Sequence, residues 1–185
     1  MDSLNIICNN CVGGSIYRKL QIPYSNPFIW IGMNREDFIY LINHYDEIDF
    51  SKRKIIKTDF FRIIIDDKIS MRFSHHIEDP NYDIPTRKEY GNIYYKDMMN
   101  YILDCYDKRL KRMKKDPIFI ISDKKTQPEN HNFFAGDYLK NINTKYRVIY
   151  CGAEDPKIDN IEFVKCDEQD VKKIASIIVS KIDLK

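Results

Sequence analysis

The residues with the clearest capacity for chemistry form a short loop. The stretch Asn9–Gly14 reads Asn-Asn-Cys-Val-Gly-Gly and follows the apolar run Leu4–Cys8. That run predicts a short buried strand, and residues 15–20 predict a helix, so Cys11 is expected in a strand–loop–helix turn. A thiol at a helix start feels backbone N–H groups and the positive end of the helix dipole, which lower its pKa. Cys11 is therefore our candidate nucleophile for an acyl thioester or ester.

Four neighbours of Cys11 are candidates for binding substrate. Gly13 and Gly14 could let backbone N–H groups reach an oxyanion or a phosphate, and the amides of Asn9 and Asn10 could contact the ligand. In the alternative interpretation, the asparagines build the turn, the glycines relieve strain and Cys11 is a small packed residue. The sequence leaves both interpretations open.

A base and its orienting group are sought at two other predicted strand ends. His75 and His76 follow the predicted strand 69–73 and open a long loop. Adjacent residues of a strand point to opposite faces, so we expect one of them, His75, to act as general base, with His76 as a binding residue. Asp123 ends an apolar strand, where open α/β sheets place ligands, and could orient the histidine. Capping roles in loops and turns are the alternatives.

Arg109 and Arg112 are candidate phosphate ligands. They lie three positions apart near the end of a helix predicted over residues 93–115, and so share one helix face. Two guanidinium groups could clamp a phosphate of a nucleotide sugar or of coenzyme A. The alternative is a solvated basic helix end, since cations suit helix C-termini.

The cysteines do not predict a metal site or a disulfide framework. There are five, and Cys8 and Cys11 form the only C-x-x-C pair. A structural zinc site would need two further ligands, and Cys8 is expected to be buried in its strand, which disfavours a redox pair. The sequence also lacks a Walker loop, G-x-G-x-x-G and G-x-S-x-G.

Apolar strands and helices alternate along the chain. Strands are expected over residues 4–8, 28–32, 61–65, 69–73, 118–122, 146–151 and 161–165, and helices over 15–20, 35–46, 93–115, 130–141 and after Asp167. Asn34 and Asp167 are the expected helix caps, and Asp66-Asp67-Lys68 the expected hairpin turn. This pattern predicts a single α/β domain over residues 1–185, with a three-layer, Rossmann-like, mostly parallel sheet, helices on both faces and one antiparallel hairpin.

The composition excludes few classes of function, but it gives no support for some classes of binding partner. Hydrophobic residues make up 43% and charged residues 31%, and the net charge is +2, so there is no global argument for nucleic acid or an anionic membrane. No signal peptide and no apolar stretch of about 20 residues is present, so we expect a cytoplasmic protein without a transmembrane segment. The 13 Tyr and 10 Phe allow an aromatic sugar-binding surface as an alternative.

Several segments together resemble one family. They are Asn5–Gly14, Leu20–Phe28, Asn34–Phe38, Phe73–His76, the helix end with Tyr106, Arg109 and Arg112, and Ile118–Asp123. They are similar to the exopolysaccharide-biosynthesis proteins grouped as domain of unknown function 1919, over about residues 5–151. The chain departs from the family pattern at Val12, where an aromatic residue is usual, and at Tyr106, where we expect Trp.

The resemblance implies a role in bacterial surface-polysaccharide biosynthesis. Our first hypothesis is an O-acyltransferase with Cys11 as nucleophile or oxyanion contact, His75 as base and Asp123 as its orienter. Coenzyme A thioester would be the donor and a nucleotide- or lipid-linked sugar the acceptor. The alternatives are a glycosyltransferase or sugar-phosphate enzyme using the same crevice, and a non-catalytic glycan-binding assembly subunit. The oligomeric state stays open.

Overall fold

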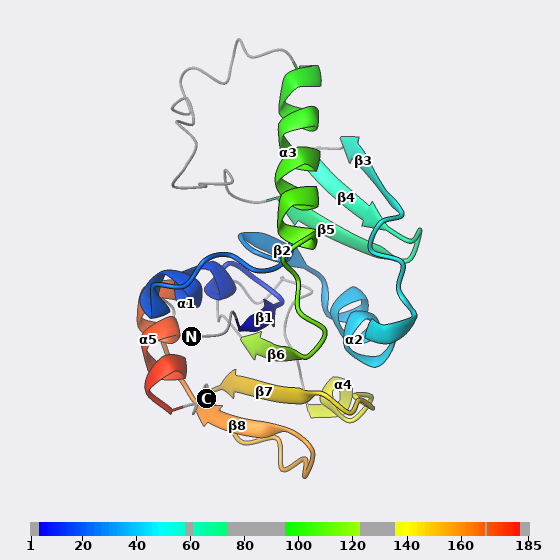
Figure 1. Cartoon of the computed structure of the whole chain (residues 1–185). Coiled ribbons are helices and arrows are strands. Elements are labelled where there is room, and N and C mark those ends of the chain that lie inside the picture. Colours follow the sequence, from blue (N-terminus) through cyan, green and yellow to red (C-terminus); the bar gives the residue numbers. More distant parts are fainter. Residues whose placement is uncertain (1–3, 58–60, 74–94, 123–135, 169, 182–185) are drawn as a thin grey trace.

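The computed structural model describes residues 4–57, 61–73, 95–122, 136–168 and 170–181, which form two four-stranded sheets with helices around them (Figure 1). One sheet is parallel and the other antiparallel. The expected α/β class is confirmed. The expected single sheet with an attached hairpin is wrong, because the hairpin strands belong to the second sheet.

The parallel sheet has the order β1-β6-β7-β8. Its strands are β1 (Asn5–Cys8), β6 (Pro117–Ser122), β7 (Arg147–Gly152) and β8 (Glu162–Lys165). The first three are almost entirely buried, as expected for parallel strands that are covered on both faces. All four carboxyl ends point the same way.

Two helices cover one face of the parallel sheet. They are α1 (Val12–Leu20) and α5 (Val171–Lys181), which lie side by side (Figure 1). Ile16 and Ile178 pack there against Cys8 and Ile120. The cap of α5 is Asp170 rather than the predicted Asp167, since the amides of the first turn bond to the Asp170 carboxylate at 2.9 and 3.0 Å.

The antiparallel sheet has the order β2-β5-β4-β3. Its strands are β2 (Ile31–Met33), β3 (Arg53–Lys57), β4 (Phe61–Ile65) and β5 (Ile69–Phe73). The predicted hairpin turn is confirmed, with Asp66 and Asp67 both at positive φ. Met33 N donates to Asn9 O at 3.0 Å, so β2 ends beside the carboxyl end of β1.

The second face of the parallel sheet packs on a core shared with the antiparallel sheet and the remaining helices. These are α2 (Arg35–Asn43), the 3-10 turn η1 (Tyr45–Glu47), α3 (Tyr95–Leu110) and the short α4 (Gly136–Leu139). The rings of Phe38 and Phe119 meet edge to face at 6.2 Å. Asn34 caps α2 as predicted, accepting from Asp37 N at 2.7 Å. The helix expected over 93–115 ends earlier, at Leu110.

β1 is an outer strand of the parallel sheet, and side chains take the place of a neighbouring strand on its open side. Ile6 N donates to Tyr17 Oη at 2.9 Å, and Ile6 O accepts from Asn26 Nδ2 at 2.8 Å. Leu4 O accepts from the hydroxyls of Tyr17 and Ser25. The backbone groups that an outer strand would expose are thereby satisfied.

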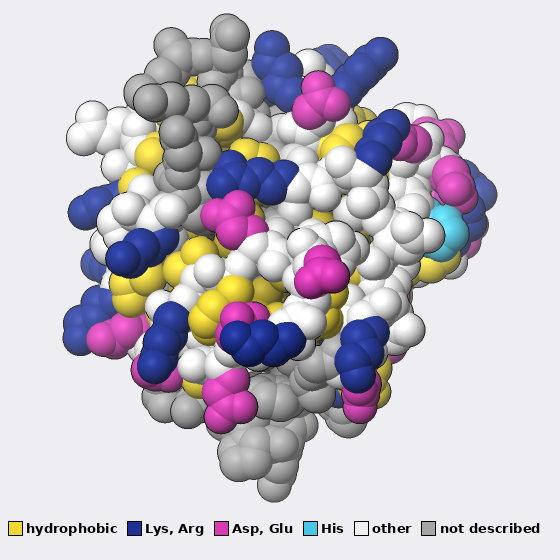
Figure 2. Space-filling model, turned by 90° about the horizontal axis from the view of Figure 1, so that it is seen from below, with side chains coloured by type: hydrophobic (Ala, Val, Ile, Leu, Met, Phe, Trp, Pro, Cys, Tyr) yellow, Lys and Arg dark blue, Asp and Glu magenta, His cyan; other side chains and the backbone are white. Residues whose placement is uncertain are grey.

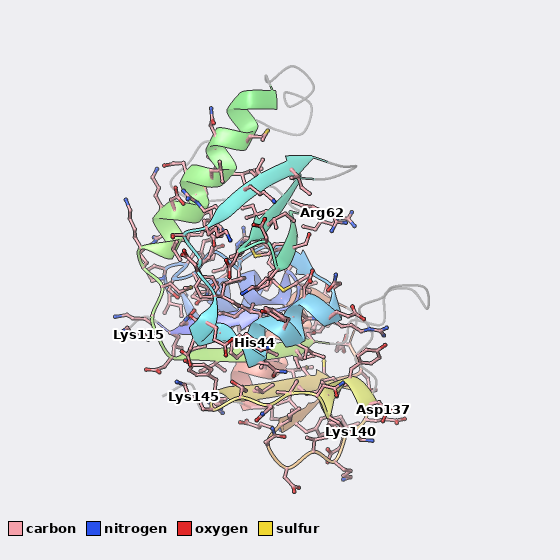
Figure 3. All side chains as sticks on the ribbon, turned by 90° about the vertical axis from the view of Figure 1, so that its right-hand side faces the viewer. His44, Arg62, Lys115, Asp137, Lys140 and Lys145 are labelled. Carbon is pink, nitrogen blue, oxygen red and sulfur yellow. The ribbon has the colours of Figure 1, made fainter. Side chains whose placement is uncertain are left out.

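The two ends of the parallel sheet can be followed in Figure 3. Lys115 and Lys145 precede β6 and β7 and mark the amino end, while Asp137 follows β6 and lies on the opposite side. Asp137 and Lys140 pair there at 2.8 Å. The carboxyl end, where the loop after β1 lies, is the end at which parallel sheets place ligands.

Candidate functional site

Cys11 lies at the carboxyl end of β1 and is the N-cap residue of α1. Its φ and ψ are −65° and −6°, and its side chain makes no capping hydrogen bond. All five cysteines belong to the described residues, and Cys11 is partly exposed whereas the other four are buried. The predicted order of strand, loop and helix is confirmed, but α1 starts at Val12 rather than at Ser15, so Gly13 and Gly14 lie inside the helix and not in the loop. A reagent or substrate has access to one thiol.

Asn9 and Asn10 fix the loop to the neighbouring strand. Asn9 Oδ1 accepts from Ser122 N at 2.9 Å, and Ser122 O accepts from Asn9 Nδ2 at 3.3 Å and from Asn10 Nδ2 at 2.9 Å. Asn10 Oδ1 accepts from Val12 N at 3.0 Å, and Gly13 N donates to Asn10 O at 3.3 Å. The two asparagines thus hold β1, β6 and the start of α1 together, which positions Cys11.

Ser122 places a buried hydroxyl under this loop. The residue is 2% exposed, and among the described residues its Oγ has no hydrogen-bond partner. Side chains alternate along β6, and Ile120 belongs to the face that α1 covers, so Ser122 points to the α1 side as well. A buried hydroxyl without a partner is uncommon and is often found where a ligand or water binds.

Cys8 is not a second reactive thiol. Burial raises its pKa to about 12, against which hydrogen bonds from the loop backbone act only weakly. A thiol of that kind stays protonated at neutral pH and is a poor nucleophile. The burial of Cys8 disfavours a redox pair of Cys8 and Cys11, as the sequence predicted. Within the described part of the chain, no three His, Cys, Asp or Glu side chains gather in a way that could hold a metal ion.

The two glycines of α1 allow close packing rather than an unusual backbone, since neither has a positive φ. A Cβ atom on Gly14 would lie 2.3 Å from an indole carbon of Trp30. On Gly13 it would lie 3.0 Å from Cys8 Cβ. Gly14 is therefore required by the indole that rests on it, and Gly13 by the strand beneath.

Arg109 and Arg112 do not share an environment. Arg109 is 2% exposed, and its guanidinium carbon lies 5.2 Å from the centre of the Tyr24 ring. Arg112 lies beyond the end of α3 and is exposed. The helix ends at Leu110, so the expected common helix face is absent and the two arginines do not form a symmetrical clamp.

Three predicted residues, His75, His76 and Asp123, lie outside the described residues. Their predicted roles stay predictions. His44 lies in the described part, at the C-terminal end of α2 (Figure 3). It contacts Glu47 at 3.0 Å and stacks on Tyr40, an arrangement that gives it a structural role.

The structure adds three residues that the sequence did not single out: Trp30, Tyr24 and Arg18. Trp30 has a φ of 61°, and its Nε1 donates to Tyr24 Oη at 3.2 Å. The Arg18 guanidinium carbon lies 4.6 Å from the Trp30 ring centre. The available signal in the sequence was that Trp30 is the only tryptophan of the chain.

Charges of both signs are mixed on the face seen in Figure 2, where Lys and Arg side chains alternate with Asp and Glu and leave hydrophobic side chains visible between them. No single-sign field covers that face, in keeping with the net charge of +2. Among the helices that the structure describes, none combines the length and apolarity needed to cross a bilayer.

Comparison with known proteins places the chain in a family. A search of curated proteins found no match. The model of the family described as Domain of unknown function (DUF1919) matches residues 1–182, which include both sheets and the loop with Cys11. The chain therefore belongs to the DUF1919 family.

Proposed function

We propose that the protein is a transferase of bacterial surface-polysaccharide biosynthesis that moves an acyl group to a sugar hydroxyl, with Cys11 as nucleophile. One observation carries the proposal: the only cysteine that is not buried is the N-cap of α1 at the carboxyl end of a parallel sheet. Helix N-termini in general favour negatively charged groups, and open parallel sheets bind substrates at their carboxyl end. The resemblance to exopolysaccharide proteins supports the sugar as acceptor.

The reaction would run in two steps. The Cys11 thiolate attacks the carbonyl carbon of a coenzyme A thioester; the new C–S bond forms, the old one breaks, and the coenzyme A thiolate leaves and takes up a proton. A sugar hydroxyl then attacks acyl-Cys11, its proton passes to the base, and the Cys11 thiolate is released with the ester formed. His75 as base and Asp123 as its orienter complete the proposal.

Mass spectrometry of the intact protein after incubation with acetyl-coenzyme A tests the first step. We expect one added acetyl group on Cys11, and none in Cys11→Ala. Cys166→Ala is the matched control, because it removes a buried thiol and should leave acylation intact. An acetyl-enzyme that persists in Cys11→Ala, or an unchanged transfer rate in that variant, would rule out the nucleophile role.

One observation favours sugar transfer as a second candidate. The amides of Val12 and Gly13 already donate to Asn10, so the start of α1 offers fewer N–H groups to an oxyanion than an open helix start does. In that case Cys11 is structural and the donor is a nucleotide sugar. Thermal unfolding separates the two, since a ligand that binds only the folded state raises Tm. Stabilisation by nucleotide sugars but not by coenzyme A compounds would favour sugar transfer.

A further inference from the structure

The Trp30 indole packs against α1 at Gly14, one helical turn beyond Cys11. The close approach of the indole to Gly14 and the 4.6 Å between the Arg18 guanidinium and the ring centre show that α1 supplies both contacts. Cys11, Gly14 and Arg18 are three and four positions apart, so they follow one face of the helix. That face therefore carries a thiol, an indole and a guanidinium in a row.

Tyr24 holds the indole of Trp30 and the guanidinium of Arg18 in place. Its Oη accepts from Trp30 Nε1 at 3.2 Å and from Arg18 Nε at 3.3 Å. Its ring is nearly buried and meets Tyr17 edge to face at 5.9 Å. The indole and the guanidinium are thus ordered in the free protein, so a ligand that contacts them loses little affinity to ordering.

Packing of the indole alone does not explain the backbone conformation of Trp30. Its φ of 61° is left-handed, a conformation that costs free energy for any residue with a Cβ, and most for a bulky one. The ring stays partly exposed, and Arg18 is exposed. Residues held in sparsely populated backbone conformations cluster at active sites and ligand clamps.

We propose that Trp30 and Arg18 form a subsite for a phosphorylated sugar, the sugar ring contacting the exposed part of the indole and the phosphate contacting the guanidinium. The inference rests on the proposed function for the part that Cys11 plays, and it adds the substrate class. Aromatic faces accept the apolar C–H face of a sugar, and Arg is suited to phosphate. Cys11 and Arg18 are about 10 Å apart along the helix axis. A sugar hydroxyl remote from the phosphate would then lie on the side of the Cys11 thiol.

The chain's only tryptophan makes the test direct, because all indole emission reports on Trp30. We would titrate the full chain with the 1-phosphates of glucose, galactose, mannose and N-acetylglucosamine, and with glucose, inorganic phosphate and uridine 5′-monophosphate. We expect a saturable change in emission with at least one sugar 1-phosphate, and much weaker binding of glucose or phosphate alone. No saturable change with any sugar phosphate, or tighter binding of uridine 5′-monophosphate, overturns the proposal.

Variants separate this inference from the proposed function. Arg18→Gln should weaken binding of the sugar phosphate at least about tenfold, the loss expected for a charge-assisted hydrogen bond. Lys19→Gln removes a neighbouring exposed charge from α1 and should bind like the parent. Equal losses of sugar-phosphate binding in Arg18→Gln and Lys19→Gln would contradict the proposed subsite. Cys11→Ala should keep full binding while losing acylation; acylated Cys11 without any sugar-phosphate binding refutes only the subsite.

Discussion

Two polar regions border the same short strand, one along its open side and one at its carboxyl end, and they differ in what their side chains do. Asn5, Tyr17, Ser25, Asn26 and Tyr45 form the edge cluster along the open side of β1, and their polar atoms bond to one another and to backbone. The Cys11 loop (Asn9, Asn10 and Cys11) lies at the carboxyl end of β1. The side chains of its two asparagines bond to the backbone of β6, and its thiol stays accessible. Polar groups with all partners in place stabilise the fold, whereas the accessible thiol is the candidate for chemistry.

The largest effect should come from removing Asn26. Its Nδ2 contacts Asn5 Oδ1, Ile6 O and Tyr17 Oη at 2.8–3.0 Å, and its Oδ1 accepts from Phe28 N. Asn26→Ala leaves several buried groups without partners and should cost about 3–5 kcal/mol of unfolding free energy, measured with urea. The exposed Asn160 makes one bond to Ile142 O and serves as control. Equal losses in the two variants would contradict the role of the edge cluster.

The next largest effect should be a loss of stability at alkaline pH. Burial raises the pKa of Tyr45, in the edge cluster, from 10.0 to about 12, and it raises the pKa of Cys8, elsewhere on β1, from 9.0 to about 12. The folded state therefore keeps protons that the unfolded state loses, and stability that is complete below about pH 9 declines as pH rises towards about 12. Urea unfolding in reducing buffer at increasing pH measures the decline. Tyr45→Phe cannot ionise at this position and should make the decline shallower; an identical slope would exclude Tyr45 as a cause.

The two glycines beside the Cys11 loop should respond differently to alanine. Gly14→Ala puts a methyl group 2.3 Å from the Trp30 ring and should cost about 1–3 kcal/mol by overpacking, despite the gain in helix propensity. Gly13→Ala meets Cys8 Cβ at 3.0 Å and should cost less. Thermal unfolding gives the order, and tryptophan emission should change in Gly14→Ala alone. The reverse order would show that the indole does not rest on Gly14.

Ser122→Ala should be a small stabilising change. It removes a buried hydroxyl that has no partner among the described residues and keeps the backbone bonds to Asn9 and Asn10. We expect about 1 kcal/mol of added stability, by urea unfolding. If acyl transfer falls in the same variant, the hydroxyl serves the reaction, because polar groups kept at a stability cost are typical of active sites. A destabilised variant would mean that the hydroxyl has a structural partner.

The smallest change in stability should come from Cys11→Ala. The side chain is partly exposed and makes no capping bond, so the unfolding free energy should change by no more than about 0.5 kcal/mol. Cys8→Ala removes a fully buried thiol from the same segment and should cost more. Comparable losses in the two variants would make Cys11 a packing residue and remove the contrast between the two regions.

The sequence predicted the local elements well and their pairing poorly. Apolar runs and caps identified β1, β6, α2 and the hairpin turn, because those signals lie within a few residues of one another. The assignment of β2 to β5, and so the second sheet, depends on contacts about 40 residues apart that no local pattern records. Two helix boundaries, the end of α3 at Leu110 and the cap of α5 at Asp170, were predicted incorrectly for a local reason, because neighbouring residues offer similar boundary signals.

The candidate site was predicted in part. The position of Cys11 followed from strand, loop and helix signals, whereas the bonds of Asn9 and Asn10 depend on Ser122, a residue far along the chain. Trp30 was not predicted as a site residue, because residue type reveals neither its left-handed backbone nor its contact with Gly14. The burial of Arg109 could not be seen either, since its position near a helix end suggests a solvated cation.

The pairing of β1 with β6 also has a consequence for folding. Asn9 and Ser122 are 113 positions apart, so a ribosome must complete more than half of the chain before the Cys11 loop can acquire its anchor. Long-range pairing of parallel strands is slow compared with helix formation. Tyr17, Ser25 and Asn26 are close to β1 in sequence and can cover its open side much sooner. The Cys11 loop is therefore synthesised long before the strand that anchors it, and it is completed after the open side of β1 is covered.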